Sequence, residues 1–198
     1  MPKIIFTIIC CLLLGGVAWT EELIKYTEEQ MYYLHGLACY EKSEWDEAIA
    51  AYTEAIRIDP EYSWAYNNRG NVYYQKNECD KAIADYTEAI RIDPKLDIAY
   101  YGRGISYYRK DKFNQAIADY TEAIRIDPKL AQAYTNRGSA YVRKGDYDQA
   151  IADYTEAIRI DPKSATAYKN RGMTYKKKGD TAKAEADFDR MKKLGYQP

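Results

Sequence analysis

The chain has 198 residues, of which 29 are basic and 30 acidic, so its formal net charge is only -1. A chain with so little net charge has no overall field to attract nucleic acid or an anionic membrane, and we expect no nucleic acid partner. The single histidine argues against catalysis by imidazole groups.

The N-terminal residues have the pattern of an export signal. Lys3 precedes an apolar run of 16 residues, 4–19, which is shorter than a membrane-spanning helix of roughly 20 residues. Gly16 and Ala18 place small residues where a signal peptidase cleaves. We predict a signal peptide over residues 1–18 and an exported protein, in the bacterial periplasm or cell envelope or secreted. The alternative is that the apolar run is kept as a membrane anchor, and only then do we expect contact with a membrane.

One segment of thirteen residues recurs along the chain. AIADYTEAIRIDP occurs at residues 82–94, 116–128 and 150–162, and residues 48–60 differ from it only in Ala51. Successive copies start 34 residues apart, a period that indicates stacked supersecondary units. Alignment on the Asp-Pro pairs predicts a lead-in helical segment followed by five repeats, with these bounds: 19–28, then 29–62, 63–96, 97–130, 131–164 and 165–198.

Each repeat is predicted to be a pair of helices. In the second half of a repeat, Ala82, Ile83, Tyr86, Ala89 and Ile90 follow a spacing that only an α-helix gathers on one face. The first half is also helical by its spacing, and Asp-Pro ends each repeat because the residue before proline resists helical ψ. Helices of about 13 residues are marginal alone in water, so neighbouring pairs must pack together. The sequence therefore predicts an all-α solenoid.

This pattern resembles the tetratricopeptide repeat (TPR) family, whose 34-residue unit carries W-x-x-L-G-x-x-Y, A-x-x-x-F and P. The resemblance covers residues 29–198 and implies a right-handed α-solenoid of five repeats. Glycine in the middle of a helix costs about 1 kcal/mol relative to alanine, so a glycine column predicts a close helix crossing. The column contains one glycine from each repeat: Gly36, Gly70, Gly104, Gly138 and Gly172.

The seventh position of the repeat departs from the family pattern, which has leucine there. Four repeats carry arginine at this position and aspartate at position 23, whereas repeat one carries His35 and Ala51. Because the two residue types are present together and absent together, we predict an ion pair between the two helices of each of these repeats. Duplication alone could also carry both residues along. The predicted pairs are Arg69 with Asp85, Arg103 with Asp119, Arg137 with Asp153, and Arg171 with Asp187.

No group of residues in the sequence predicts catalysis or metal binding. The chain lacks G-x-S-x-G, H-E-x-x-H and P-loop motifs, and it has no C-x-x-C or cysteine–histidine cluster for zinc. Cys39 and Cys79 stand at positions held by aromatic residues in other repeats, which predicts buried thiols. We therefore expect no enzyme activity, no catalytic residue, no cofactor and no metal.

The resemblance implies a concave groove, lined by the first helix of each repeat, that binds another protein or an extended peptide. Asparagines at position 6 are expected to hold a peptide backbone, since an amide both donates and accepts. The groove is expected to run from aromatic to basic, and so to suit a segment that is apolar toward repeat two and acidic toward repeat five. The predicted groove residues are Trp64, Asn68, Tyr74, Ile98, Tyr101, Ile105, Arg109, Asn136, Arg143, Lys169, Asn170, Lys176 and Lys177.

The first helices differ between repeats while the second helices are nearly identical. Separate binding subsites would need such variation, but recent duplication followed by drift explains it equally well. An alternative function is a structural subunit of a cell-envelope assembly, held at the membrane by residues 4–19.

Overall fold

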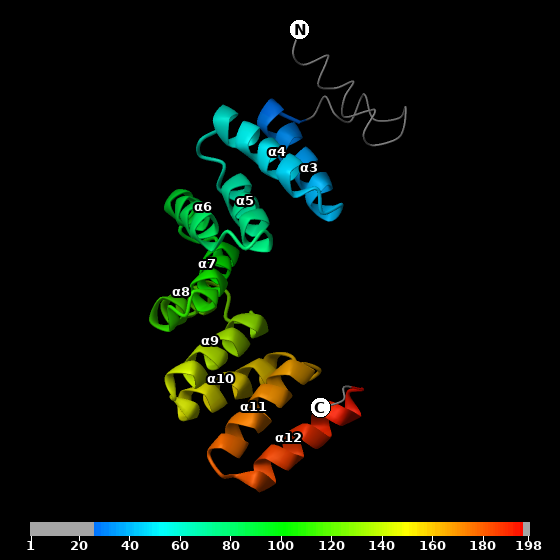
Figure 1. Cartoon of the computed structure of the whole chain (residues 1–198), viewed down its shortest axis with the longest axis vertical. Helices are drawn as coiled ribbons and strands as arrows, with labels where there is room; N and C mark the ends of the chain where they lie inside the picture. The colour runs from blue at the N-terminus through cyan, green and yellow to red at the C-terminus, as the bar shows by residue number, and fades with distance from the viewer. Residues whose placement is uncertain (1–25, 196–198) are drawn as a thin grey trace. The chain divides into compact units, whose positions relative to one another are not determined.

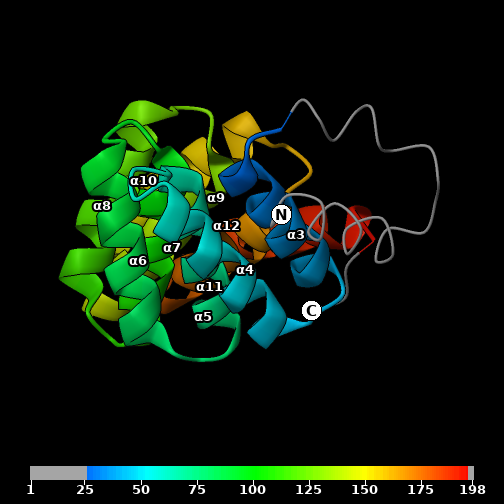
Figure 2. The ribbon, with the colours of Figure 1, turned by 90° about the horizontal axis from the view of Figure 1, so that it is seen from above.

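The computed structural model describes residues 26–195, and all regular structure in this part of the chain is helical (Figures 1 and 2). The predicted signal peptide and residues 19–25 of the lead-in segment lie outside the described residues. Tyr26 and Thr27 are not helical, because the first described helix begins at Glu28 and the backbone N–H of Thr27 donates to the side chain of Gln30 in a capping box. The ten described helices are α3 (Glu28–Glu41), α4 (Trp45–Ile58), α5 (Ser63–Gln75), α6 (Cys79–Ile92), α7 (Asp97–Arg109), α8 (Phe113–Ile126), α9 (Ala131–Lys144), α10 (Tyr147–Ile160), α11 (Ala165–Lys177) and α12 (Thr181–Lys193).

The chain forms two compact units, residues 1–94 and 95–198. The described part of the N-terminal unit contains the helix pairs α3/α4 and α5/α6, and α4 also packs against α5. The C-terminal unit contains the pairs α7/α8, α9/α10 and α11/α12, and each pair packs against the next one within the unit. In both units consecutive first helices touch: α3 contacts α5, and α9 contacts both α7 and α11. The all-α repeat fold predicted from the sequence is therefore confirmed.

The second helices supply small and large core side chains in alternation. The alanine that opens each apolar stripe is at most 1% exposed: Ala48, Ala82, Ala116, Ala150 and Ala184. Four residues later the first four repeats bury a tyrosine almost completely: Tyr52, Tyr86, Tyr120 and Tyr154. Burying aromatic rings removes a large apolar area from water, which stabilises short helices that would not persist alone.

Glycine allows the two helices of a pair to cross closely. A Cβ atom added to Gly104 would lie 2.7 Å from Cε1 of Tyr120, closer than any normal carbon–carbon contact. The glycines of the other repeats meet the aromatic ring of their own second helix in the same way, with Phe188 facing Gly172. The glycine column therefore exists because the aromatic ring occupies the space where a side chain would start.

The predicted ion pair is present in all four repeats that carry its residues. In repeat two, Nε of Arg69 donates to Oδ2 of Asp85 at 2.8 Å and Nη2 donates to Oδ1 at 2.8 Å. The other three pairs have the same two bonds, at 2.8 to 2.9 Å. Within each of the two units the arginine also reaches the preceding repeat, where Nη1 of Arg69 donates to Oγ1 of Thr53 at 2.9 Å. The arginine thus joins three helices.

Repeat one replaces this ion pair with less polar groups. Ala51 is buried, and His35 is half-buried in α3. Burial lowers the pKa of the His35 imidazole below 6.5, although Glu44 opposes this shift. The neutral imidazole is therefore the form that the folded protein favours at neutral pH.

The two cysteines differ in burial. Cys39 lies in the core of the N-terminal unit with 4% of its surface exposed, as predicted. Cys79 is only half-buried, which corrects the expectation of a buried thiol. Cys79 is the first residue of α6, and the aromatic residues that begin other second helices, Trp45 and Phe113, are half-buried as well. Neither cysteine forms a disulfide.

Candidate functional site

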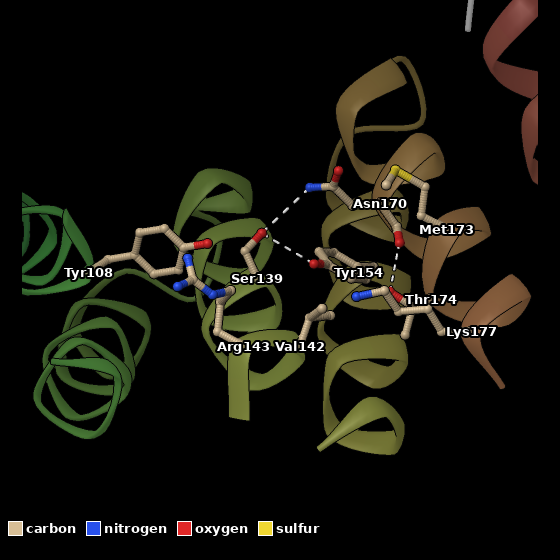
Figure 3. A pocket seen from close by; sticks show the side chains of 9 residues that line it. All are labelled: Tyr108, Ser139, Val142, Arg143, Tyr154, Asn170, Met173, Thr174 and Lys177. Carbon is tan, nitrogen blue, oxygen red and sulfur yellow. Dashed lines mark hydrogen bonds between the residues drawn. The ribbon is translucent and has the colours of Figure 1, made fainter. Parts of the chain in front are cut away.

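The C-terminal unit contains an open pocket with a volume of about 150 Å³ (Figure 3). Three first helices and one second helix line it: Tyr108 comes from α7, Ser139, Val142 and Arg143 from α9, Tyr154 from α10, and Asn170, Met173, Thr174 and Lys177 from α11. Because α9 contacts both α7 and α11, residues about 34 positions apart in the sequence meet at this place.

A network of hydrogen bonds centred on Ser139 forms one side of the pocket (Figure 3). Its Oγ donates to the carbonyl oxygen of Thr135 at 3.0 Å and shares a hydrogen bond of 3.1 Å with the hydroxyl of Tyr154. Nδ2 of Asn170 donates to the same Oγ at 3.5 Å, a long and therefore weak bond. Burial raises the pKa of Tyr154 to about 12, so the phenol stays neutral at physiological pH. The network is uncharged.

Apolar side chains provide most of the remaining surface. Val142 and Met173 come from neighbouring first helices, and the ring of Tyr108 lies opposite (Figure 3). Met173 keeps 48% of its surface exposed. An apolar cavity of roughly this volume holds a benzene-sized group in other proteins. The pocket is therefore large enough for one apolar side chain.

Two cations flank the pocket at the C-terminal ends of their helices. Nη2 of Arg143 donates to Oδ1 of Asp111 at 2.8 Å, and its guanidinium lies 4.6 Å from the ring centroid of Phe113. The ammonium of Lys177 lies 5.9 Å from the ring centroid of Tyr147 and forms no ion pair within residues 26–195. Arg143 is thus already paired with a carboxylate, whereas Lys177 has no acidic partner within the described residues.

The first helices of the two units carry opposite charge. Neither α9 nor α11 contains an acidic residue, and Asp97 is the one acidic residue in α7. Beyond the arginines that pair with the aspartate of their own repeat, these three helices contain six basic residues: Arg109, Arg143, Lys144, Lys169, Lys176 and Lys177. In the N-terminal unit, α3 carries three glutamates and no lysine or arginine. The first helices of the C-terminal unit are therefore basic, and the groove that they are expected to line stays a prediction.

Three of the predicted groove residues line the pocket: Arg143, Asn170 and Lys177. Lys169 and Lys176 are exposed on the same helix, α11, but outside the pocket lining. Ile98, Tyr101, Ile105, Arg109 and Asn136 belong to the same unit and do not line it. Trp64, Asn68 and Tyr74 belong to the N-terminal unit, where Trp64 is 45% exposed. A single groove that runs through all five repeats stays a prediction.

Two of the three asparagines that are expected to hold a peptide backbone donate to a tyrosine of the preceding repeat. Nδ2 of Asn68 donates to the hydroxyl of Tyr33 at 2.9 Å, and Nδ2 of Asn136 donates to the hydroxyl of Tyr101 at 3.0 Å. Positions 5 and 6 of consecutive first helices lie beside each other, so the amide bonds to the preceding repeat. Asn170 is different because repeat four has Thr135 at position 5, and its amide makes only the long bond to Ser139.

The sequence analysis did not name six of the pocket residues. Four of them stand at equivalent positions of the first helices: position 9 of the repeat for Ser139 and Met173, and position 12 for Tyr108 and Val142. The alignment of the repeats could therefore have found them. Thr174 and Tyr154 do not share these positions, and both are buried in the folded protein. Only the packing of α10 against α9 brings the Tyr154 hydroxyl to the pocket.

In the described part of the chain, no group of three or more histidine, cysteine, aspartate or glutamate side chains is arranged so that it could hold a metal ion. Within residues 26–195, no helix has the length and apolar character needed to span a membrane.

The helix pairs, the glycine–aromatic crossing and the contacts between consecutive first helices define a helical repeat protein. The family model described as TPR repeat matches residues 36–77, 70–111, 106–145 and 138–179, and the model described as tetratricopeptide repeat matches residues 165–194. The chain therefore belongs to the TPR family. No curated protein matches this chain.

Several solved structures have the same fold. A crystal structure of MamA is 28% identical in sequence, has a TM-score of 0.76 and covers 81% of this chain and 94% of its own. MamA from Desulfovibrio magneticus RS-1 is 18% identical, with a TM-score of 0.79 over 86% of this chain and 96% of its own. YrrB, described as a TPR protein with an unusual peptide-binding site, is 23% identical, with a TM-score of 0.72 over 90% of this chain and 92% of its own. At these identities the last two show a shared fold alone.

Proposed function

We propose that the protein is a non-catalytic scaffold that binds an extended, acidic segment of a partner protein on the first-helix face of its C-terminal unit. The TPR family supports a role in protein interaction, and the charge of α9 and α11 supports the choice of face. The excess of lysine and arginine on these helices, in a chain with a net charge of only -1, is the observation that carries the proposal.

The lysines of α11 are available to a ligand. Lys169, Lys176 and Lys177 are exposed and form no ion pair within residues 26–195. A carboxylate brought near them would lose little hydration and would gain the attraction of several positive charges at once. Each exposed charge pair contributes only about 0 to 1 kcal/mol and is screened by salt, so recognition requires several pairs. An acidic segment, rather than a single acidic residue, therefore fits this face.

The chemistry of the pocket supports binding and not catalysis. Two hydroxyls of the lining, those of Ser139 and Thr174, are of a type that can act as a nucleophile. Ser139 Oγ contacts the phenol of Tyr154, and Thr174 Oγ1 donates to the backbone carbonyl oxygen of Asn170. A neutral phenol with a raised pKa is a poor general base at physiological pH. No carboxylate or imidazole belongs to the lining.

The test uses the full-length protein and a fluorescent Gly/Ser peptide that carries several aspartates. Lys176→Glu/Lys177→Glu reverses two charges in the last turn of α11, and we expect it to weaken peptide binding roughly tenfold at low salt. Lys192→Glu/Lys193→Glu makes the same change in the last turn of α12, outside the first helices, and we expect less than about a twofold effect. Fluorescence anisotropy measures both dissociation constants.

Equal affinity of the two double variants for the aspartate peptide would overturn the proposal. A lysine-containing peptide of the same length controls for charge and is expected not to bind. Stronger binding of a single-stranded oligonucleotide than of the acidic peptide would instead assign the basic face to nucleic acid.

We also propose export of the protein, on the composition of residues 1–19 alone. A signal peptide is expected to be removed after Ala18, whereas an anchored structural subunit would keep residues 4–19. N-terminal sequencing of the protein from its host's cell envelope distinguishes these two forms, and recovery of the intact chain from the cytoplasm would contradict both.

A further inference from the structure

The pocket between α9 and α11 is an apolar hollow at the edge of a basic face. Its lining is predominantly apolar, and Val142, Met173 and Tyr108 face the same space (Figure 3). Methionine has a flexible and polarisable side chain that adapts to different partners, and it is common at binding surfaces for this reason. The exposure of Met173, 48%, leaves apolar area that a ligand could cover.

We infer that this pocket takes one aliphatic or aromatic side chain of the bound segment, and that an acidic residue two positions away in the same segment contacts Lys177. This inference rests on the proposed function, because the acidic segment is the one that the basic face binds. It adds a specific requirement for an apolar residue at a defined spacing.

The spacing follows from the geometry of α11. Met173 and Lys177 are four residues apart on one helix, so their side chains lie on the same face and are separated by one turn, with Cβ atoms about 5 to 6 Å apart. In an extended segment, residues two apart point to the same side and lie roughly 6.6 Å apart. An apolar residue in the pocket therefore places the residue two positions along the segment at Lys177.

Asn170, Met173 and Lys177 follow one another along α11, so the polar side of the pocket suits the ligand backbone on the side of the apolar residue that lies away from Lys177. Nδ2 of Asn170 makes only the 3.5 Å bond to Ser139, so it can turn to a peptide carbonyl at little cost. Met173 is three residues from Asn170 on α11, which places the amide beside the apolar contact. The amides of Asn68 and Asn136 are less available to a peptide carbonyl, because each already donates to a tyrosine of the preceding repeat.

Arg143 contributes a second cation at the same end of the pocket, but a less available one. Its guanidinium is held by Asp111 and lies over the ring of Phe113. A carboxylate of the ligand would have to compete with Asp111 for Arg143, whereas Lys177 has no acidic partner within the described residues. The acidic residue is therefore expected to contact Lys177 first.

The test measures the binding of four Gly/Ser peptides to the full-length protein, and the first three carry the same aspartates. The first has leucine two positions before an aspartate, the second has leucine next to that aspartate, the third has serine in place of leucine, and the fourth has glutamine in place of that aspartate. Burial of an apolar side chain predicts that replacing leucine with serine weakens binding roughly tenfold. The shifted leucine and the glutamine peptide are also expected to bind more weakly than the first peptide.

Met173→Ser is the matched protein variant, and its exposed position means that the fold should be unaffected. With this variant the difference between the leucine and serine peptides is expected to fall below about twofold. Leu34→Ser, which replaces another exposed apolar residue on a first helix but in the N-terminal unit, is expected to behave as the unchanged protein. Equal melting temperatures of the three proteins confirm that binding, and not folding, is compared.

The outcomes separate this inference from the proposed function. If the aspartate peptides bind but leucine and serine give the same affinity, the apolar subsite is overturned and the acidic-segment scaffold stands. If leucine matters but its position relative to aspartate does not, the two-residue spacing is overturned. If no aspartate peptide binds, the proposed function fails and this inference fails with it.

Discussion

Arg103 and Asp119 lie on the two helices of one repeat and form two parallel hydrogen bonds, of 2.9 Å and 2.8 Å, with side chains that are 17% and 8% exposed. A bidentate pair of this kind satisfies both carboxylate oxygens inside the fold. Burial raises the pKa of the Asp119 carboxyl, and the hydrogen bonds from Arg103 oppose the shift. The pair therefore stabilises the fold only when both partners are present.

Removing one partner should be strongly destabilising. Asp119→Ala leaves the Arg103 guanidinium buried without its carboxylate, and we expect a loss of about 3 kcal/mol in the free energy of unfolding. The double variant Arg103→Met/Asp119→Leu should recover most of this loss, because it leaves no buried charge. Urea unfolding followed by circular dichroism measures these changes.

The control for this prediction lies on the same helix. Glu122 forms an exposed ion pair with Arg125 at 2.8 Å, and Glu122→Ala should leave the unfolding curve nearly unchanged. A coupling energy near zero between Arg103 and Asp119 in the double-mutant cycle would contradict the structural role of the buried pair.

Substitution of Gly104 should destabilise the protein even though alanine favours helices. Gly→Ala inside a helix normally stabilises by about 1 kcal/mol, but here the new Cβ would lie 2.7 Å from the ring of Tyr120. We expect Gly104→Ala to give no gain and Gly104→Leu to lose at least about 1 kcal/mol through overpacking. Thermal and urea unfolding of both variants measure this. Adding Tyr120→Leu to the Gly104→Leu variant should reduce the loss of stability that Gly104→Leu causes. A Gly104→Ala variant more stable than the unchanged protein would refute the close crossing.

The asparagines of the first helices should separate into structural and binding residues. Asn136→Ala removes the bond to Tyr101, and we expect it to cost about 1 kcal/mol of stability. Asn170→Ala removes only a 3.5 Å bond, so it should cost less stability and should weaken binding of the leucine-containing aspartate peptide more. The two variants are compared by urea unfolding and by fluorescence anisotropy. The opposite order in either measurement would reverse these assignments.

The pH dependence of stability near neutrality should depend on His35. Burial lowers the pKa of its imidazole, so the unfolded chain binds more protons than the folded chain as the pH falls through about 6.5. Stability is therefore expected to be full above this pH and to decrease below it. His35→Gln should flatten the dependence of the melting temperature between about pH 7.5 and 5.5, where no other side-chain type has its ordinary pKa. Identical pH profiles of the two proteins would show that His35 does not titrate differently on folding.

Contacts that recur from repeat to repeat could be predicted from the sequence. The helix pairs, the close crossing at Gly104 and the pairing of Arg103 with Asp119 all follow from residues that keep one spacing within a repeat, because copies of one structural unit repeat the same local contacts. The basic character of α11, the first helix of repeat five, could also be predicted from the sequence, since charge is a property of residue type.

The pocket depended on side chains that differ from repeat to repeat. Ser139 and Met173 share one position of their repeats, and a second helix adds the Tyr154 hydroxyl, but this spacing alone does not predict a cavity. Whether an amide is available to a ligand likewise depends on which neighbour has already used it, as Tyr101 uses Asn136 while Asn170 retains a weak bond. Sequence alone was therefore sufficient for contacts set by the 34-residue period, whereas tertiary packing decided which polar groups are satisfied and where apolar surface stays open, because both depend on side chains that meet across different repeats.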